Sequence, residues 1–271
     1  MTDKYGVIGN PIAHSKSPQI HALFAQQTGH DISYEAIFSE TDKFINTVKE
    51  FQNAGGKGMN VTVPFKQEAW ELADTLSDRA RLAGAVNTLS FNDDGTISGD
   101  NTDGAGMVAD IKINLGVEFT SKRVLILGAG GAVRGVLLPV ISESPADITI
   151  ANRTVSKAVD LAAAFANKTN IHACGFNELE GQQFDIIING TSAGLGGEMP
   201  PIPASIIADY CCCYDMVYSD KPTTFVEWAQ DNGAAIAADG LGMLVGQAAE
   251  SFFIWRSVRP ETKSVMAALR P

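Results

Sequence analysis

Residues 123–133 read RVLILGAGGAV, and this stretch decides the fold that the sequence predicts. Its apolar run, residues 124–127, is typical of a strand buried on both faces of a parallel sheet. The run ends at a glycine-rich turn, and a helix-compatible segment follows. Gly128 can make the tight turn, and Gly130 lets the backbone approach a diphosphate group at the helix N-terminus. We therefore predict a dinucleotide-binding turn, in which Val133 replaces the usual third glycine.

The next predicted strand, residues 146–151, indicates which dinucleotide binds. A dinucleotide site places the residue that contacts the adenosine ribose at the end of this strand. An acidic residue there would accept a hydrogen bond from the 2′-hydroxyl group and favour NAD. Here the neutral Asn152 is followed by Arg153 and Lys157, which suit a 2′-phosphate. We predict NADP as the cofactor; in the alternative interpretation both cations are ordinary solvated charges.

Strands and helices alternate regularly beyond residue 124, which predicts a Rossmann-like, doubly wound sheet. The residues before it also read as an α/β domain, so the fold class is α/β with two domains. We expect a substrate domain at 1–103, completed by a C-terminal helical segment at 240–271, and a dinucleotide-binding domain at 104–239. The six predicted strands of the second domain are residues 124–127, 147–151, 171–174, 185–188, 211–216 and 235–238.

Composition excludes several classes of partner. The chain has 271 residues, 45% of them hydrophobic and 19% charged, with a net charge of −11. Nucleic acids and anionic membranes both need a basic face, so neither is an expected partner. Four cysteines, Cys174 and the triplet 211–213, read as small buried hydrophobic residues, and no metal site is expected. With no apolar run of membrane-spanning length and no leader pattern, we expect a cytoplasmic protein.

Ser15 and Ser17 precede a predicted helix, residues 18–28. Pro18 at the first helical position makes Ser17 a natural N-cap. In an extended segment the two hydroxyls face the same way, and beside a helix N-terminus they could hold a carboxylate. A plain capping role for Ser17 is the alternative.

Lys66 and Asp103 each stand at the start of a predicted helix. Lys66 follows a strand, GMNVTVPF, whose Asn60 and Thr62 lie on one polar face. A lone lysine at a strand end is usually solvated, which is the alternative interpretation. Its charge opposes the helix dipole, however, and this conflict favours a functional reason for a lysine there. Asp103, in the segment GDNTDGAG, reads by itself as the cap of helix 104–114. A long final helix is expected to carry Gly240, Met243 and Gln247 along one line.

Together these motifs resemble the shikimate dehydrogenase family over nearly the whole chain. The resemblance implies an enzyme that reduces 3-dehydroshikimate to shikimate reversibly with NADPH, on the route to aromatic amino acids. The motifs occur in the family's order: GNPIAHSKSPQIHALF, GMNVTVPFK, LAGAVNTL, GDNTDGAG, GAGGA, NRT, YDMVY and DGLGMLVGQA.

The resemblance also implies roles for individual residues. Lys66 and Asp103 correspond to the catalytic pair. The substrate carboxylate would be bound by Ser15 and Ser17 with Tyr218 nearby, and the ring hydroxyls by Thr62, Asn87 and Gln247. The residues implied for NADP are the diphosphate loop Gly128, Ala129, Gly130, Gly131 and Ala132, the 2′-phosphate clamp Asn152, Arg153, Thr154 and Lys157, and the nicotinamide contacts Val217, Gly240 and Met243.

The pairing of Lys66 with Asp103 also makes chemical sense. Hydride transfer to a ketone develops charge on the carbonyl oxygen, which an acid must neutralise. The ammonium of Lys66 can stabilise that charge and supply the proton, and the carboxylate of Asp103 can orient the lysine and share the proton.

Three alternatives have to be weighed against this function. A quinate/shikimate paralogue would accept quinate and NAD, and Arg153 argues against NAD. A non-catalytic nucleotide-binding sensor would lack the pair Lys66 and Asp103. A methyltransferase of related fold would want an acidic residue where Asn152 stands. A homodimer is one expectation for the oligomeric state.

Overall fold

The computed structural model describes residues 2–196 and 198–270. The chain forms two compact units, Met1–Gly106 with Val245–Leu269, and Met107–Leu244 with Arg270–Pro271, called units 1 and 2 below. The changes of unit after Gly106 and after Leu244 fall inside helices, a few residues after the predicted boundaries at 103 and 239. Residues 1 and 271, the ends of the predicted first domain, lie outside the described residues.

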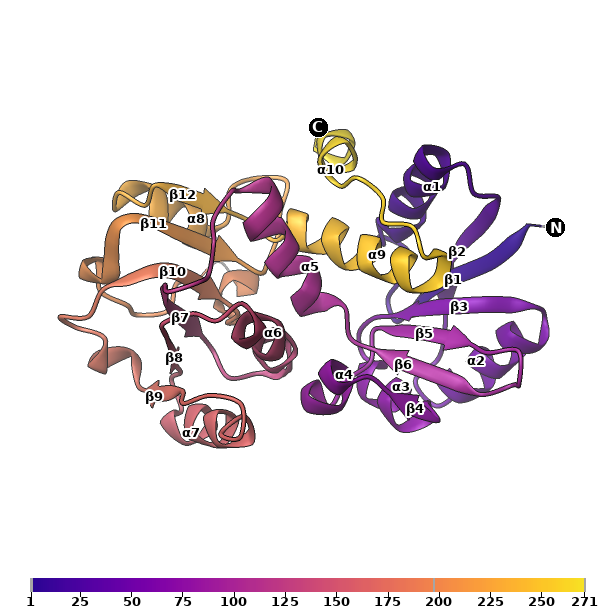
Figure 1. The fold of residues 1–271 in the computed structure, drawn as a ribbon, viewed down its shortest axis with the longest axis horizontal. Helices are drawn as coiled ribbons and strands as arrows, with labels where there is room; N and C mark the ends of the chain where they lie inside the picture. The colour runs from indigo at the N-terminus through magenta and orange to yellow at the C-terminus, as the bar shows by residue number, and fades with distance from the viewer. Residues whose placement is uncertain (1, 197, 271) are drawn as a thin grey trace. The chain divides into compact units, whose positions relative to one another are not determined.

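Unit 1 is built on one six-stranded mixed sheet in the order β2-β1-β3-β5-β6-β4 (Figure 1). β2, β1 and β3 are parallel, β5 runs antiparallel to both β3 and β6, and β4 is parallel to β6. The strands are β1 (Asp3–Gly9), β2 (Ile32–Phe38), β3 (Gly56–Val61), β4 (Thr75–Leu76), β5 (Thr88–Phe91) and β6 (Ile97–Asp100).

Among the described residues, seven α-helices lie wholly or partly in unit 1. The chain passes into unit 2 through α5 and returns through α9. The helices are α1 (Ser17–Thr28), α2 (Phe44–Asn53), α3 (Lys66–Leu72), α4 (Asp78–Ala83), α5 (Asp103–Ala109), α9 (Leu241–Arg256) and α10 (Lys263–Leu269).

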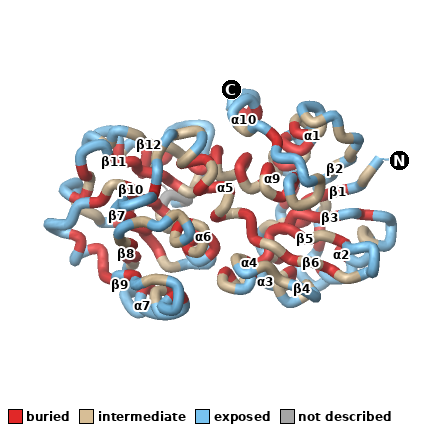
Figure 2. The backbone as a smooth tube through the Cα atoms, in the orientation of Figure 1, coloured by how far each residue is buried: buried red, intermediate tan, exposed pale blue. Residues whose placement is uncertain are grey.

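Most residues of β1, β3 and β5 are buried, and they anchor α9 (Figure 2). Trp255 on α9 donates a hydrogen bond from Nε1 to the Leu89 carbonyl oxygen at 3.1 Å. Gly58 permits this approach, since a Cβ atom there would lie 2.4 Å from Trp255 Nε1. Each large apolar side chain buried in this core contributes roughly 1.5–3 kcal/mol. The C-terminal segment is therefore part of the core of unit 1.

Two glycines bring α5 and α9 into backbone contact within unit 1. A Cβ atom on Gly246 would lie 2.5 Å from the Gly106 carbonyl oxygen, and one on Gly106 would lie 2.2 Å from the Gln247 nitrogen. Any side chain at either position would collide with backbone. The chain therefore leaves unit 1 in α5 and re-enters it in α9 at two points that are in contact.

Unit 2 confirms the predicted doubly wound sheet. Its six strands are all parallel, in the order β12-β11-β10-β7-β8-β9. Counted from β7, this is the order 3-2-1-4-5-6 of a dinucleotide-binding sheet. The elements are β7 (Arg123–Leu127), α6 (Gly131–Ser142), β8 (Asp147–Ala151), α7 (Val155–Ala164), β9 (His172–Cys174), β10 (Phe184–Asn189), β11 (Ile207–Asp215), α8 (Thr224–Asp231) and β12 (Ile236–Ala238).

The cysteine triplet lies in β11 as predicted. All four cysteines are free thiols and buried, and burial is the main cause that raises the pKa of Cys212 to about 12. Across the described ranges, no group of His, Cys, Asp and Glu side chains could hold a metal ion. Within those ranges, no helix combines the length and the apolar character needed to cross a membrane.

The structure corrects three local predictions near the expected site. Ser17 is not the N-cap of α1, because the backbone is already helical at Lys16 and Ser17 is the first helical residue. β3 ends at Val61, so Thr62 follows the strand instead of lying on its polar face. Asp103 begins α5 without capping it, and the predicted helix 104–114 changes to a π-helix at Asp110–Asn114.

The predicted C-terminal helical segment is also corrected. α9 begins at Leu241, so Gly240 precedes the helix and does not share a line of it with Met243 and Gln247. After α9, Ser257 adopts a positive φ of 57°, and a short helix, α10, follows separately.

Candidate active site

Lys66 and Asp103 form a direct ion pair in unit 1. Lys66 Nζ donates a hydrogen bond to Asp103 Oδ2 at 2.6 Å. The two side chains are 31% and 18% exposed, so a small molecule can reach them while water around them is restricted. Each residue is the first of a short helix, α3 and α5 respectively, which fixes where its side chain starts.

Asn87 holds the other side of the Asp103 carboxylate. Its Nδ2 donates to Asp103 Oδ1 at 2.8 Å and lies 3.4 Å from Gln247 Oε1. Its Oδ1 accepts hydrogen bonds from the backbone and hydroxyl of Thr102, at 2.9 and 3.1 Å. Asn87 is 3% exposed. The buried amide therefore orients Asp103 and joins it to α9.

Further hydroxyl and amide groups form a hydrogen-bond network next to Asn87, on residues that do not contact Lys66 or Asp103 in the described hydrogen bonds. Ser251 on α9 lies 2.8 Å from the Thr88 hydroxyl and accepts from Asn60 Nδ2 at 2.9 Å. Asn60 Oδ1 in turn accepts from the Tyr34 hydroxyl at 2.7 Å. The sequence alone assigns these residues no role in the site. Asn60, Thr88 and Thr102 do lie inside the quoted motifs, whereas Tyr34 and Ser251 carried no signal.

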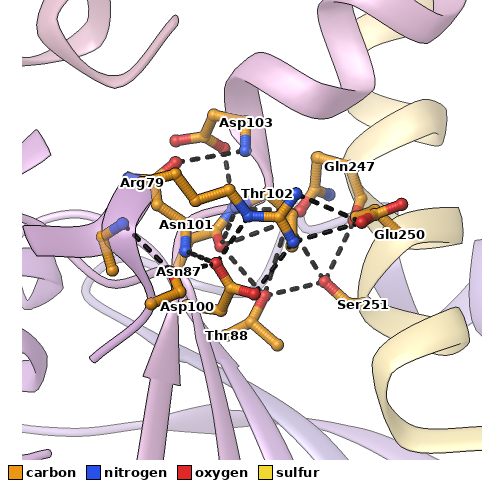
Figure 3. Close-up of polar contacts among 12 residues, drawn as sticks. Arg79, Asn87, Thr88, Asp100, Asn101, Thr102, Asp103, Gln247, Glu250 and Ser251 are labelled. Carbon is orange, nitrogen blue, oxygen red and sulfur yellow. Dashed lines mark hydrogen bonds and ion pairs between the residues drawn. The ribbon is translucent and has the colours of Figure 1, made fainter. Parts of the chain in front are cut away.

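An ion-pair cluster borders this network, as Figure 3 shows. Arg79 on α4 binds Asp100 through two hydrogen bonds and also contacts Glu250 on α9. Burial acts to raise the pKa of Asp100, but Arg79, Ser77 and the Asn101 amide outweigh it and hold that pKa below its usual range. The sequence offered no signal for this cluster, because charges on short helices are usually solvated.

The remaining substrate residues predicted in unit 1 lie near turns. Ser17 is 7% exposed, and its backbone N–H donates to Ser15 Oγ at 3.3 Å, so the two serines are adjacent. The Thr62 amide bonds to the Ile8 carbonyl oxygen at 3.0 Å, which ties it to the end of β1. None of these three residues bonds directly to Lys66 or Asp103 among the described contacts.

The glycine turn of unit 2 fits a diphosphate group. Gly128 has φ +104°, and a Cβ atom there would lie 3.0 Å from the Gly190 carbonyl oxygen, so only glycine suits the turn. At Gly130 and Gly131 no described atom lies within 4 Å of an added Cβ position, which leaves open space beside the backbone. In the described part of the chain, no side chain caps α6, whose first amides can therefore receive an anion. Ala129 and Ala132 complete this loop.

The predicted 2′-phosphate clamp lies beside that turn. The Gly128 amide bonds to the Ala151 carbonyl oxygen at 2.8 Å, which joins the ends of β7 and β8. Asn152 Nδ2 bonds to the Thr154 carbonyl oxygen at 2.8 Å. Arg153 and Lys157 are exposed, and neither forms an ion pair within residues 2–196 and 198–270. The two cations are thus available to an anionic ligand.

The predicted nicotinamide contacts lie together at the ends of β11 and β12. The Gly240 amide bonds to the Val217 carbonyl oxygen at 3.0 Å, and the Met243 amide bonds to the Tyr214 hydroxyl at 3.0 Å. Tyr214 donates to the buried carboxylate of Asp110 at 2.7 Å. Asp110 was missed by sequence analysis, and Tyr214 appeared only within a quoted motif.

Tyr218 belongs to unit 2, whereas Ser15 and Ser17 belong to unit 1. Burial, followed by the charge of Asp220, raises the pKa of Tyr218. Its place beside the substrate carboxylate stays a prediction.

Three family models match this chain. The shikimate dehydrogenase substrate binding domain matches residues 7–89, the shikimate/quinate 5-dehydrogenase model matches 109–195, and the shikimate 5′-dehydrogenase C-terminal domain matches 240–270. The chain belongs to the shikimate dehydrogenase family.

Full-length relatives agree with this membership. Shikimate dehydrogenase (NADP(+)) of Cellvibrio japonicus is 57% identical, with 100% of this chain and 98% of the relative covered. The same enzyme of Alkalilimnicola ehrlichii is 56% identical, and 100% of each chain is covered.

Two solved structures have the same fold as this chain. An Ael1 enzyme from Pseudomonas putida is 47% identical with a TM-score of 0.96, covering 100% of this chain and 99% of that one. The shikimate 5-dehydrogenase of Thermus thermophilus, solved with NADP(H) and shikimate, is 30% identical with a TM-score of 0.86, and 98% of each chain is covered.

Proposed function

We infer that this chain catalyses the reaction of its family, the NADP-dependent, reversible reduction of 3-dehydroshikimate to shikimate in aromatic amino-acid biosynthesis. The names of its full-length relatives support the reaction and the cofactor. The observation that carries the site assignment is the Lys66–Asp103 pair, oriented by Asn87, in a chain whose other unit has an open dinucleotide turn.

Lys66 and Asp103 are the proposed acid–base pair. NADPH, when bound, supplies the hydride that converts the ketone to an alcohol. The carbonyl oxygen then needs a proton, and the Lys66 ammonium still has hydrogens beyond the one donated to Asp103. Asp103 holds that ammonium in place and shares its proton. In the reverse direction the same pair accepts the proton of the substrate hydroxyl.

The remaining polar residues of unit 1 are proposed to hold the substrate. Asn87 and Gln247 lie next to the pair and present amide groups suited to ring hydroxyls. Thr62, four residues before Lys66, is assigned the same role. Ser15 and Ser17 are proposed to bind the substrate carboxylate, with Tyr218 contributing from unit 2.

The cofactor is proposed to bind along the carboxyl-terminal edge of the unit 2 sheet. The loop Gly128–Ala132 would hold the diphosphate. Arg153 and Lys157, with Asn152 and Thr154, would hold the 2′-phosphate by charge-assisted hydrogen bonds. Val217, Gly240 and Met243 would contact the nicotinamide. The open space at Gly130 and the exposure of Arg153 support these assignments.

Cellular location and assembly are further proposals. Four free thiols suit a reducing compartment, which supports a cytoplasmic location. A homodimer stays a prediction, to be measured by light scattering during size-exclusion chromatography.

One assay tests the function against its nearest alternative. Absorbance at 340 nm is followed while shikimate and quinate are each combined with NADP and with NAD. We expect the highest kcat/KM for shikimate with NADP. A higher value for quinate with NAD would identify a quinate/shikimate paralogue, and no turnover in any combination would indicate a sensor.

A further inference from the structure

Arg79 connects two segments that border the proposed catalytic pair. Its Nε and Nη2 atoms donate to Asp100 Oδ1 and Oδ2 at 2.6 and 2.8 Å, a bidentate pair. Its Nη1 and Nη2 atoms both donate to Glu250 Oε1 at 3.1 Å. The Arg79, Asp100 and Glu250 side chains are 21%, 20% and 14% exposed. Shielding from water makes such contacts stronger and more directional than surface ion pairs.

The Asp100 end of this cluster leads directly to Asp103. Asp100 Oδ1 accepts a hydrogen bond from the Asn101 backbone at 2.7 Å, and Asn101 Oδ1 accepts one from the Asp103 backbone at 3.2 Å. Asn101 is also held by its side-chain bond to the Ala85 carbonyl oxygen at 3.1 Å. The turn that presents the Asp103 carboxylate is thus hydrogen-bonded to Asp100, and Arg79 in turn binds the Asp100 carboxylate.

The Glu250 end leads to Gln247. Both residues lie on α9, three positions apart, and therefore share a face of the helix. Gln247 meets Asn87, the amide that orients Asp103. Arg79 consequently holds, with one planar group, both the turn that carries Asp103 and the helix that carries Gln247 (Figure 3).

We propose that Arg79 is a positioning residue of the active site: through Asp100 and Glu250 it sets the placement of the Asp103 carboxylate and the Gln247 amide. This inference rests on the proposed function of Lys66 and Asp103. Arg79 itself contacts neither of these two residues among the described hydrogen bonds and ion pairs.

The test compares Arg79→Lys with Arg256→Lys. Lysine keeps a positive charge between the two carboxylates but cannot make the bidentate bond and reach Glu250 together. Arg256 is a matched control, because it also anchors α9 by an ion pair and is 22% exposed, yet it bonds to Asp3 and Tyr5 on β1. Steady-state kinetics are measured well below both melting temperatures, with circular dichroism giving the folded fraction.

We expect Arg79→Lys to lower kcat for shikimate about 10- to 100-fold, the cost of a small misplacement of catalytic groups. The KM for NADP should stay within about twofold, because the cofactor is assigned to unit 2. Arg256→Lys should keep kcat within about twofold at a comparable loss of melting temperature. If Arg79→Lys also keeps kcat while losing thermal stability, Arg79 has only a structural role and the proposal is wrong.

If Arg79→Lys does not fold, a second variant, Glu250→Ala, tests the positioning role of Arg79. Glu250→Ala leaves the Arg79–Asp100 pair intact, and the other partner of Glu250, Arg259, is 49% exposed, so no buried charge is left without a partner. Freed from Arg79, α9 should present Gln247 less accurately, and the KM for shikimate should rise about three- to tenfold. Unchanged KM and kcat would contradict the proposal. A Lys66→Ala variant with full turnover would instead overturn the function of the pair, so the two failures can be told apart.

Discussion

Lys66 Nζ lies 2.6 Å from Asp103 Oδ2, although 37 residues separate the two in the chain. Neither residue decides the function by its local sequence, since a lysine that follows a strand is usually solvated and an aspartate at a helix start commonly serves as a cap. Together they make an ammonium–carboxylate pair whose second carboxylate oxygen is held by a buried amide. This relationship makes the chemistry of the site testable by substitution.

Lys66→Ala and Asp103→Ala should each lower kcat by about 10²–10⁴-fold, the usual contribution of general acid–base catalysis. If the two residues handle one proton together, the double variant should fall little below the worse single variant. The measurement is a double-mutant cycle on kcat, with NADP affinity expected to change little. Circular dichroism controls for folding. Strictly additive losses would show that the residues act independently.

Arg153→Ala should raise the KM for NADP at least about tenfold and leave the KM for NAD nearly unchanged, because a charge-assisted bond to the 2′-phosphate is worth about 1.5–3 kcal/mol. Lys168→Ala removes an exposed cation of the same unit away from this strand end, and serves as the control. Equal losses with NADP and NAD would mean that Arg153 does not recognise the 2′-phosphate.

Replacing Ser15 and Ser17 together with alanine should weaken shikimate binding more than it lowers turnover at saturation. The two residues are adjacent, and their hydroxyls are the groups assigned to the substrate carboxylate. Isothermal titration calorimetry with shikimate measures the effect. A double variant that binds shikimate like the parent would place the carboxylate elsewhere.

His21 should make the protein less stable in mild acid. Its ring is fully buried and stacks on Tyr34 with 4.1 Å between ring centroids. Burial lowers its pKa to about 3; Asn60 opposes this shift, but neither ring nitrogen has a partner in hydrogen-bonding geometry within the described chain. The unfolded chain therefore binds a proton below pH about 6.5 that the folded chain does not bind until near 3.

Within that window the unfolding free energy should fall as pH falls, by up to about 1.4 kcal/mol per pH unit from His21 alone. His21→Phe, which keeps a stacking ring, should lose this slope in urea titrations between pH 7 and 4. Parallel curves for His21→Phe and wild type would show that His21 does not titrate in this way.

Much of unit 2 could be predicted because its signals are local. The apolar run 124–127, the glycine turn and the cations after β8 all lie within short stretches, and strand order follows from the topology of such sheets. The prediction that Ser17 is the N-cap of α1 was wrong for a local reason too, since the backbone is already helical at Lys16 and Ser17 is the first helical residue.

The environment of the pair in unit 1 could not be predicted from spacing. Arg79 and Glu250 are 171 residues apart and each reads as a surface charge. Their contact exists because α9 returns to unit 1 and packs on β5. Resemblance to a family identified the candidate residues, whereas only the three-dimensional structure revealed what orients them.

The touching glycines Gly106 and Gly246 mean that unit 2 interrupts unit 1 between two neighbouring points. During synthesis on the ribosome, residues 107–244 emerge before Ser251 and Trp255 are available to complete unit 1. Unit 1 therefore begins first but is completed only after unit 2, and its sheet lacks the packing of α9 while the dinucleotide-binding unit can already fold. On the proposed assignment of NADP to unit 2, a nascent chain should bind NADP before its substrate site is complete.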